Sequence, residues 1–218
     1  MRSRILFLFC LRLMITIDKI KLSDNHISLE LDNGETLDIL NQVADLYMLE
    51  SGRRIDTTEY AQLKEESQRF RCNKKALDYL AVRNRSANEM ERYLYKKGFA
   101  HNLIREVVNS LGEAGYIDDY DYATRFINNK LNKKLIGKHL LARELQKKGI
   151  ARTIIKQVLK ESEFRLNNID EIYETAVKKY NTLKLKKNGL SKLAYFLQRR
   201  GFDAEVVNVI ITRITHNK

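Results

Sequence analysis

A short motif of two basic residues, a glycine and an apolar residue occurs three times, and its spacing constrains the fold more than any other feature of the sequence. The copies are Lys96–Phe99, Lys147–Ile150 and Arg199–Phe202, with their glycines 51 and 52 residues apart. Self-similarity at a nearly fixed period is typical of proteins built from repeated supersecondary units. The chain from residue 73 onward is therefore predicted to contain three copies of one unit.

Apolar residues recur at fixed positions around each glycine. Those eight and four residues before it are Met90 and Leu94, Leu141 and Leu145, and Leu193 and Leu197. Those six and nine residues after it are Ile104 and Val107, Ile155 and Val158, and Val207 and Ile210. Steps of three and four place side chains on one face of an α-helix. A third helical segment precedes each pair, at residues 75–82, 122–131 and 171–180, so each unit is predicted to be a module of three helices.

Residues 15–40 follow a different pattern, in which apolar residues alternate with polar ones. The alternation places Ile15 and Ile17 on one face, and later Ile27, Leu29, Leu31 and Leu37. Asn33-Gly34 lies between two such runs and is a β-hairpin signal, because both residues accept positive φ. Two helices are predicted to link this sheet to the modules, at residues 42–50 and 57–70. Asp56 and Glu59 have capping-box spacing at the start of the second one.

The composition agrees with a mostly helical fold, since the 218 residues include no proline and only nine glycines. We predict a mostly α protein with three tandem three-helix repeats in a curved, elongated body, preceded by a small N-terminal β-hairpin or sheet with helices. The predicted parts are residues 14–72 for the N-terminal region, and residues 73–118, 119–167 and 168–218 for the three repeats.

The first thirteen residues are interpreted separately. Arg2 and Arg4 precede an apolar run at residues 5–11, as in a signal peptide, but no small-residue cleavage site follows. The run is also too short to span a membrane. We interpret residues 1–13 as an upstream extension before a natural start at Met14, which N-terminal sequencing of the native protein would test.

The charge is distributed unevenly along the chain. The formal net charge is +12, yet residues 1–72 hold 10 Lys and Arg against 12 Asp and Glu, so residues 73–218 carry a net charge of +14. Such asymmetry indicates that the basic part meets a polyanion, either a nucleic acid or an anionic membrane.

Basic residues recur at two positions of the helix that ends at each glycine. Six residues before the glycine stand Arg92 and Arg143, with Tyr195 in the third copy; two residues before it stand Lys96, Lys147 and Arg199. At about 100° per residue, both positions face away from the apolar stripe. More cations lie in the linkers before these helices, namely Arg83, Arg85, Lys130, Lys133 and Lys134.

Two interpretations of these cations remain open. A cation in the last turn of a helix is stabilised by the helix dipole, and charged linkers are commonly just solvated. Alternatively, recurrence in each repeat aligns the cations along one edge that follows a phosphate backbone. We take these cations as candidate contacts to DNA or to a nucleoprotein filament.

Other recurring residues are interpreted as structural caps. Gly98, Gly149 and Gly201 stand where a helix ends in a left-handed residue. Ser86, with Glu89 three residues later, has capping-box spacing, and Gly137 and Gly189 occupy the aligned position in the other repeats. Asp118 and Asp119 are interpreted as N-caps of the following helix rather than as metal ligands. Tyr120 beside them is a candidate for stacking on a base.

No pattern points to catalysis. The four histidines are scattered, no glycine-rich phosphate loop occurs, and Cys10 and Cys72 form neither a metal-ligand spacing nor a disulfide framework. We therefore predict no enzymatic activity, no cofactor, no metal, no membrane partner and a cytoplasmic location, with the protein as a monomer.

The repeats resemble the bacterial RecX family. The residues that carry the resemblance are Ala76, Leu77, Leu80, Arg83, Ser86, Glu89, Leu94, Gly98, Phe99, Gly115–Asp119, Tyr122, Ala123, Gly137, Glu144, Leu145 and Lys148–Ile150. The resemblance thins in the third repeat, and the linker Asn128–Lys134 is rich in lysine and asparagine where the family often has arginines. It implies a non-enzymatic regulator, in most members an inhibitor, that lies in the groove of the RecA–DNA filament and restrains ATP hydrolysis, strand exchange and coprotease activity.

Two rival functions remain. A stand-alone DNA-binding protein would also be basic and built from three-helix modules, and we expect any DNA contact to be weak and non-specific, to single or double strands. No module carries the Asn, Gln and Arg cluster that reads base edges. A purely structural scaffold is the third possibility, and strong salt dependence of its assemblies would argue against it.

Overall fold

The computed structural model describes residues 14–133, 135–166, 168–185 and 187–216. The interpretation of residues 1–13 and the candidate Lys134 lie outside the described residues. The chain divides into two compact units. One contains residues 14–82 and Tyr93–Asn109, and the other contains Arg83–Arg92 and residues 110–216. Each unit is described by itself.

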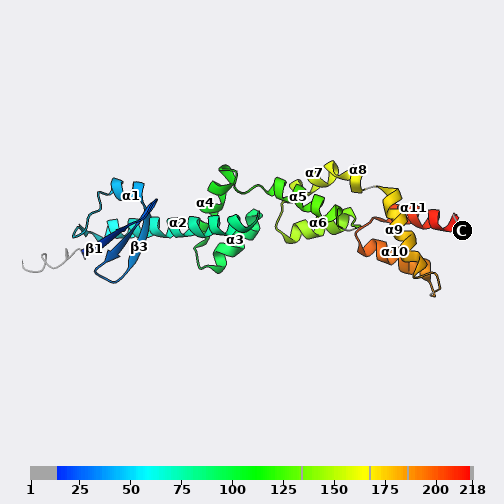
Figure 1. Ribbon diagram of the computed structural model, residues 1–218, viewed down its shortest axis with the longest axis horizontal. Helices are drawn as coiled ribbons and strands as arrows, with labels where there is room; N and C mark the ends of the chain where they lie inside the picture. The colour runs from blue at the N-terminus through cyan, green and yellow to red at the C-terminus, as the bar shows by residue number, and fades with distance from the viewer. Residues whose placement is uncertain (1–13, 134, 167, 186, 217–218) are drawn as a thin grey trace, which may run out of the picture. The chain divides into compact units, whose positions relative to one another are not determined.

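The first unit contains a small antiparallel sheet (Figure 1). Its strands are β1 (Ile15–Leu22), β2 (His26–Leu31), β3 (Thr36–Leu40) and β4 (Arg54–Ile55), in the order β3-β2-β1-β4. Asn33 and Gly34 form the turn between β2 and β3, with Gly34 at φ +80°, so the predicted hairpin is confirmed. Strand β4 was not predicted, because its two residues are too few to show an alternation.

One face of this sheet packs into a hydrophobic core of the first unit. Every second residue of β2, namely Ile27, Leu29 and Leu31, is buried, as the alternation predicted. Helix α1 (Asn41–Leu46) is shorter than the predicted helix 42–50, since the chain turns at Met48, which has φ +49°, and returns to form β4.

Helix α2 (Thr57–Val82) is one continuous helix of 26 residues, where the sequence predicted two helices with a break between residues 70 and 75. That break was wrong: residues 71–74 include neither glycine nor proline, and Cys72 is fully buried. The Asp56 carboxylate accepts hydrogen bonds from the main-chain N–H of Thr58 (2.8 Å) and Glu59 (3.0 Å), which caps the helix as predicted. Ser67 joins α2 to the sheet by accepting the N–H of Asp38 (3.0 Å).

The remaining helices follow the repeated pattern (Figure 1). They are α3 (Ala87–Lys96), α4 (His101–Glu113), α5 (Asp119–Leu131), α6 (Lys138–Lys147), α7 (Arg152–Glu161), the short α8 (Glu163–Leu166), α9 (Ile169–Asn181), α10 (Gly189–Arg199) and α11 (Ala204–His216). The six residues predicted to face the core before each glycine all have 0 % exposure: Met90, Leu94, Leu141, Leu145, Leu193 and Leu197. The mostly α fold with repeated helical modules is confirmed.

In the second unit, the second and third modules each have a core of their own. One core gathers Ile127 of α5, Leu145 of α6 and Val158 of α7. The other gathers Ala176 of α9, Leu197 of α10 and Ile210 of α11. Within the described residues, no helix combines the length and the apolar character that crossing a bilayer requires.

The continuity of α2 can be tested by Asn73→Pro. A proline at this position removes a main-chain hydrogen bond and clashes with the preceding turn, so we expect a loss of about 3 kcal/mol in the free energy of unfolding. Asn73→Ala is the control and should cost less than about 1 kcal/mol. Urea unfolding followed by circular dichroism measures both, and equal stability of the two variants would contradict a continuous helix.

Candidate functional site

The second helix of each module, namely α3, α6 or α10, carries the candidate cations on its exposed side. Four of them are exposed, namely Arg92 and Lys96 on α3, and Arg143 and Lys147 on α6. Residues four apart are neighbours on a helix surface. In the described part of the chain, none of these four side chains makes an ion pair or a side-chain hydrogen bond. Two pairs of like charges therefore face solvent without counter-ions, and each pair is suited to an anion.

In the third module, the candidate cation Arg199 lies beside an exposed aromatic ring. The guanidinium carbon of Arg199 lies 5.7 Å from the centroid of the Tyr195 ring, and 61 % of Tyr195 is exposed. Tyr95, next to Lys96 on α3, is similarly exposed and stacks on His101 with 4.8 Å between ring centroids. Exposed rings next to cations are suited to stacking on unpaired bases.

By contrast, the cation directly before each glycine interacts with other residues of the protein. Lys148 forms an ion pair with Glu89 (2.5 Å). Arg200 donates to the carbonyl of Leu135 (3.1 Å), with its guanidinium carbon 5.2 Å from the ring centroid of Phe196. Lys97 lies over a ring of its own helix, that of Tyr93, at 5.5 Å. The two residues of each basic doublet therefore have different environments.

The linker cations also differ among themselves. Arg83 forms an ion pair with Glu89 (3.2 Å), and Lys130 forms one with Glu144 (2.5 Å) while lying 5.1 Å from the ring centroid of Phe126. Arg85 is half-buried, whereas Lys133 is exposed. Among the linker cations that the structure describes, Lys133 is exposed and forms no ion pair, so it is the best placed to meet a ligand.

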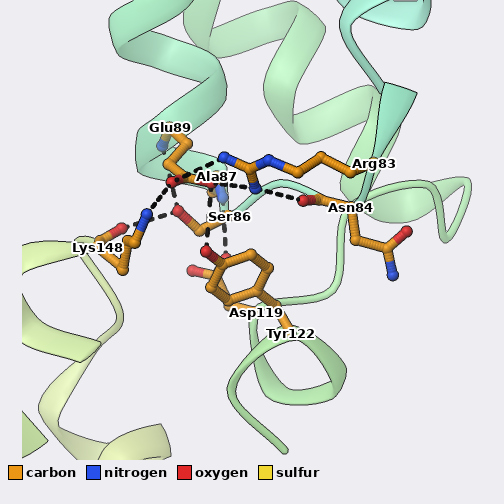
Figure 2. Close-up of polar contacts among 8 residues, drawn as sticks. All are labelled: Arg83, Asn84, Ser86, Ala87, Glu89, Asp119, Tyr122 and Lys148. Atoms are coloured by element: carbon orange, nitrogen blue, oxygen red, sulfur yellow. Dashed lines mark hydrogen bonds and ion pairs between the residues drawn. The ribbon is translucent and has the colours of Figure 1, made fainter. Parts of the chain in front are cut away.

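A polar network joins the start of α3 to the end of α6 (Figure 2). The Glu89 carboxylate accepts hydrogen bonds from Arg83 (3.2 Å), Lys148 (2.5 Å) and the hydroxyl of Tyr122 (3.3 Å). Burial by itself would raise the pKa of Glu89, but the hydrogen bonds and charges of Lys148 and Arg83 outweigh it and lower the pKa to about 2. Glu89 is thus a fixed anion at this junction.

Main-chain groups complete the same junction. The hydroxyl of the fully buried Ser86 donates to the carbonyl oxygen of Lys148 (2.7 Å) and accepts the N–H of Glu89 (3.2 Å). The Asp119 carboxylate accepts the N–H of Ala87 (2.9 Å), so this residue caps α3 rather than its own helix. Burial raises the pKa of Asp119.

The other predicted caps lie at helix ends. The Asp118 carboxylate accepts the N–H of Tyr120 (2.8 Å) and of Asp121 (3.0 Å) at the start of α5. The hydroxyl of Tyr120 donates to the Glu161 carboxylate, which holds this tyrosine against α7. Gly98, Gly149 and Gly201 have φ values of +87°, +79° and +90°.

A second junction joins the start of α6 to the end of α10. The N–H of Gly137 donates to the carbonyl of Arg200 (2.9 Å), and the N–H of His139 donates to the carbonyl of Gly201 (3.0 Å). Lys138 forms an ion pair with Asp203 (2.6 Å). The first N–H groups of a helix have no partner inside that helix, and here the last carbonyls of another helix supply one.

Sequence reasoning missed both junctions, because it treated each cap as local to its own helix. One available signal was Gly137. It is the N-cap residue just before α6 and has a φ of −94°, so left-handed backbone does not explain the glycine. A glycine without a conformational reason often marks close approach of another segment.

Comparison with known proteins identifies the modules. Residues 73–111 match the family model of the first three-helix domain of RecX, and residues 118–159 match that of the second. A protein named regulatory protein RecX from Geobacillus sp. (strain WCH70) is 30% identical over 198 residues, covering 85% of this chain and 70% of the relative. The chain belongs to the RecX family.

Other RecX proteins show the same relationship. The regulatory protein RecX of Streptococcus agalactiae serotype V is 27% identical over 202 residues, covering 93% of this chain and 78% of the relative. That of Listeria monocytogenes serotype 4b is 27% identical over 187 residues, covering 85% of this chain and 69% of the relative.

Solved structures support the fold. A crystal structure of regulatory protein RecX superposes with a TM-score of 0.74 at 20% identity, covering 90% of this chain and 98% of that one. RecX from Lactobacillus salivarius superposes with a TM-score of 0.63 at 24% identity, covering 68% and 97%. The third module lies outside the two matched RecX models, yet it repeats their helix order.

The Glu89 network predicts acid sensitivity. Because the pKa of Glu89 is lowered to about 2, its stabilisation is present above the ordinary pKa of 4.5 and is lost as the pH falls from there toward 2. We expect Glu89→Gln to lose on the order of 3 kcal/mol of unfolding free energy at pH 7, and much less near pH 2.5. Urea unfolding at both pH values measures this.

Glu91→Gln, on the same helix, is the control for the loss of one carboxylate. Its unfolding free energy should stay within about 0.5 kcal/mol of the wild-type value at pH 7. If the two variants lose equal stability at pH 7, Glu89 does not hold the junction.

Proposed function

We propose that this RecX family member regulates the RecA recombinase, in the direction of inhibition, by binding in the groove of the RecA–DNA filament. The observation that carries the proposal is the recurrence of exposed cations at equivalent positions of successive second helices, without counter-ions among the described residues. RecX relatives are named regulatory proteins, which supports a regulatory rather than a catalytic role.

The proposed mechanism is restraint of filament subunits by many weak contacts. A single exposed cation contributes about 1 kcal/mol or less to binding. Several contacts on one chain nevertheless give a higher overall affinity, because each contact after the first forms within the complex at a high effective concentration. A protein with cations on three modules would bridge neighbouring subunits and DNA phosphates. It would thereby hinder the rearrangements that accompany ATP hydrolysis and strand exchange.

A non-enzymatic role is part of the same proposal. The described residues include no group of three or more His, Cys, Asp or Glu side chains placed to hold a metal ion. Glu89, whose pKa is lowered to about 2, forms ion pairs with Arg83 and Lys148 at a junction between modules. Its charge therefore stabilises that junction.

Direct binding to DNA is the second candidate function. Tyr95 and Tyr195 favour it, since each is about 60 % exposed beside a cation and is suited to base stacking. Gel shifts of several unrelated single- and double-stranded DNAs, with and without RecA, separate the candidates. Equal affinity for bare DNA and for the filament would favour the stand-alone function.

Charge reversal tests the proposed function. We expect the wild-type protein to slow ATP hydrolysis by RecA on single-stranded DNA. The quadruple change of Arg92, Lys96, Arg143 and Lys147 to Glu should raise the concentration needed for half-inhibition roughly tenfold or more. The salt dependence of binding should also become shallower, by about one unit of slope for each phosphate that the variant no longer binds.

The matched control reverses four cations outside the second helices, namely Arg105 on α4 and Arg152, Lys156 and Lys160 on α7, all of which are exposed. It changes the net charge by the same amount. Circular dichroism must show unchanged helical content in both variants. Equal loss of inhibition in the two variants would mean that overall charge matters and that the second helices do not.

A further inference from the structure

The three glycines that end the second helices have the same backbone conformation but different surroundings. A Cβ atom built on Gly149 would lie 2.2 Å from the Cβ of Asn88, and one built on Gly201 would lie 2.3 Å from the main-chain nitrogen of Leu140. Around Gly98 there is nothing within 4 Å. Left-handed backbone therefore explains all three glycines, but close approach to another helix adds a second constraint only at Gly149 and Gly201.

The position that faces Gly201 is constrained in the same way. A Cβ on Gly137 would lie 2.3 Å from the carbonyl oxygen of Gly201, although the φ of Gly137 suits any residue. That carbonyl is the acceptor for His139. Glycine at both positions lets two main chains approach closely enough to exchange hydrogen bonds.

The two junctions thus join helices end to end. The C-terminal end of α10 meets the N-terminal end of α6, and the C-terminal end of α6 meets the N-terminal end of α3. Each contact brings the partial negative charge of a helix C-terminus to the partial positive charge of a helix N-terminus, which is favourable. When second helices are joined in this way, the distance between equivalent residues on successive helices is set by the helix length and by the close contact at each glycine.

We propose that Gly149 and Gly201 are positioning residues that fix the spacing of the exposed cations on successive second helices. The inference rests on the proposed function. It adds which residues set the spacing of the cations, a spacing that suits a polymer with regularly repeated anionic sites such as the proposed filament. In the second unit, the cations that this spacing controls are Arg92, the pair Arg143 and Lys147, and Arg199.

The test compares Gly98→Ala, Gly149→Ala and Gly201→Ala. All three place alanine at positive φ and carry a similar backbone cost, of order 1 kcal/mol. Only the last two insert a methyl group into a junction. We expect Gly98→Ala to inhibit RecA ATP hydrolysis within about twofold of wild type. The other two should need roughly tenfold more protein, with helical content by circular dichroism equal to that of Gly98→Ala.

Two readouts follow the junctions without RecA. In Gly201→Ala, the amide of His139 should lose hydrogen-exchange protection, because its acceptor is the carbonyl of residue 201. In Gly149→Ala, NMR titration should show the pKa of Glu89 rising from about 2 toward its ordinary value, since Lys148 moves away. Gly98→Ala should change neither.

A second-site change makes the test at Gly149 sharper. The three atoms closest to the added methyl group all belong to the Asn88 side chain. Asn88→Gly removes them, so the double variant with Gly149→Ala should regain both the low pKa of Glu89 and most of the inhibition, although the strain at positive φ remains. Asn88→Gly alone is the control for a glycine in a helix. At Gly201 the close atoms include the main chain of Leu140, so no such rescue is expected there.

The outcomes separate the inference from the proposed function. If wild-type protein fails to slow RecA, the proposed function is wrong, and so is this inference. If wild type inhibits while Gly149→Ala, Gly201→Ala and Gly98→Ala inhibit alike, only the inference is overturned. Loss of helical content in Gly149→Ala or Gly201→Ala beyond that in Gly98→Ala would also overturn it, because the glycine would then serve the folding of its module.

Discussion

Close contact between helix ends is the constraint on which the second unit depends. Each module can bury its own apolar stripe, but the N–H groups that begin a second helix and the carbonyls that end it need partners from elsewhere. Between α6 and α10 these groups satisfy one another, with Gly137 and His139 donating to Arg200 and Gly201. Such contact requires two main chains to come within hydrogen-bonding distance, and a single methyl group at Gly201 or Gly137 would prevent it.

Much of the fold could be predicted because its signals are local. The positions of Leu141, Leu145, Leu193 and Leu197 follow from a period of 3.6 residues, and all four are fully buried. The continuity of α2 and the pairing of β4 were not predicted, since a polar stretch of helix resembles a linker and two residues carry no period. Tertiary packing accounts for both features. Burial of Cys72 keeps α2 continuous, and pairing of Ile55 with Ile15 forms β4.

The partners at each junction could not be predicted, because they are far apart in the sequence; Gly137 signals a close approach but does not identify the segment that approaches. Gly149 meets Asn88, and Gly201 meets Leu140, across a full repeat or more in each case. Positive φ alone is enough to explain a glycine at the end of a helix. The sequence therefore gives no sign that close contact with another helix also requires glycine there. Comparing the three glycines reveals this second requirement, because Gly98 also has positive φ but has no neighbouring atoms within 4 Å of an added Cβ.

The same geometry explains why the motif carries two cations rather than one. The residue directly before the glycine points toward the junction, where Lys148 meets Glu89 and Arg200 meets the carbonyl of Leu135. In the first module, Lys97 instead lies over the ring of Tyr93 on its own helix. The residue one position earlier is rotated by about 100° and faces solvent. In the second and third modules, one cation of the doublet therefore contacts a neighbouring module, which leaves the other exposed for the proposed partner.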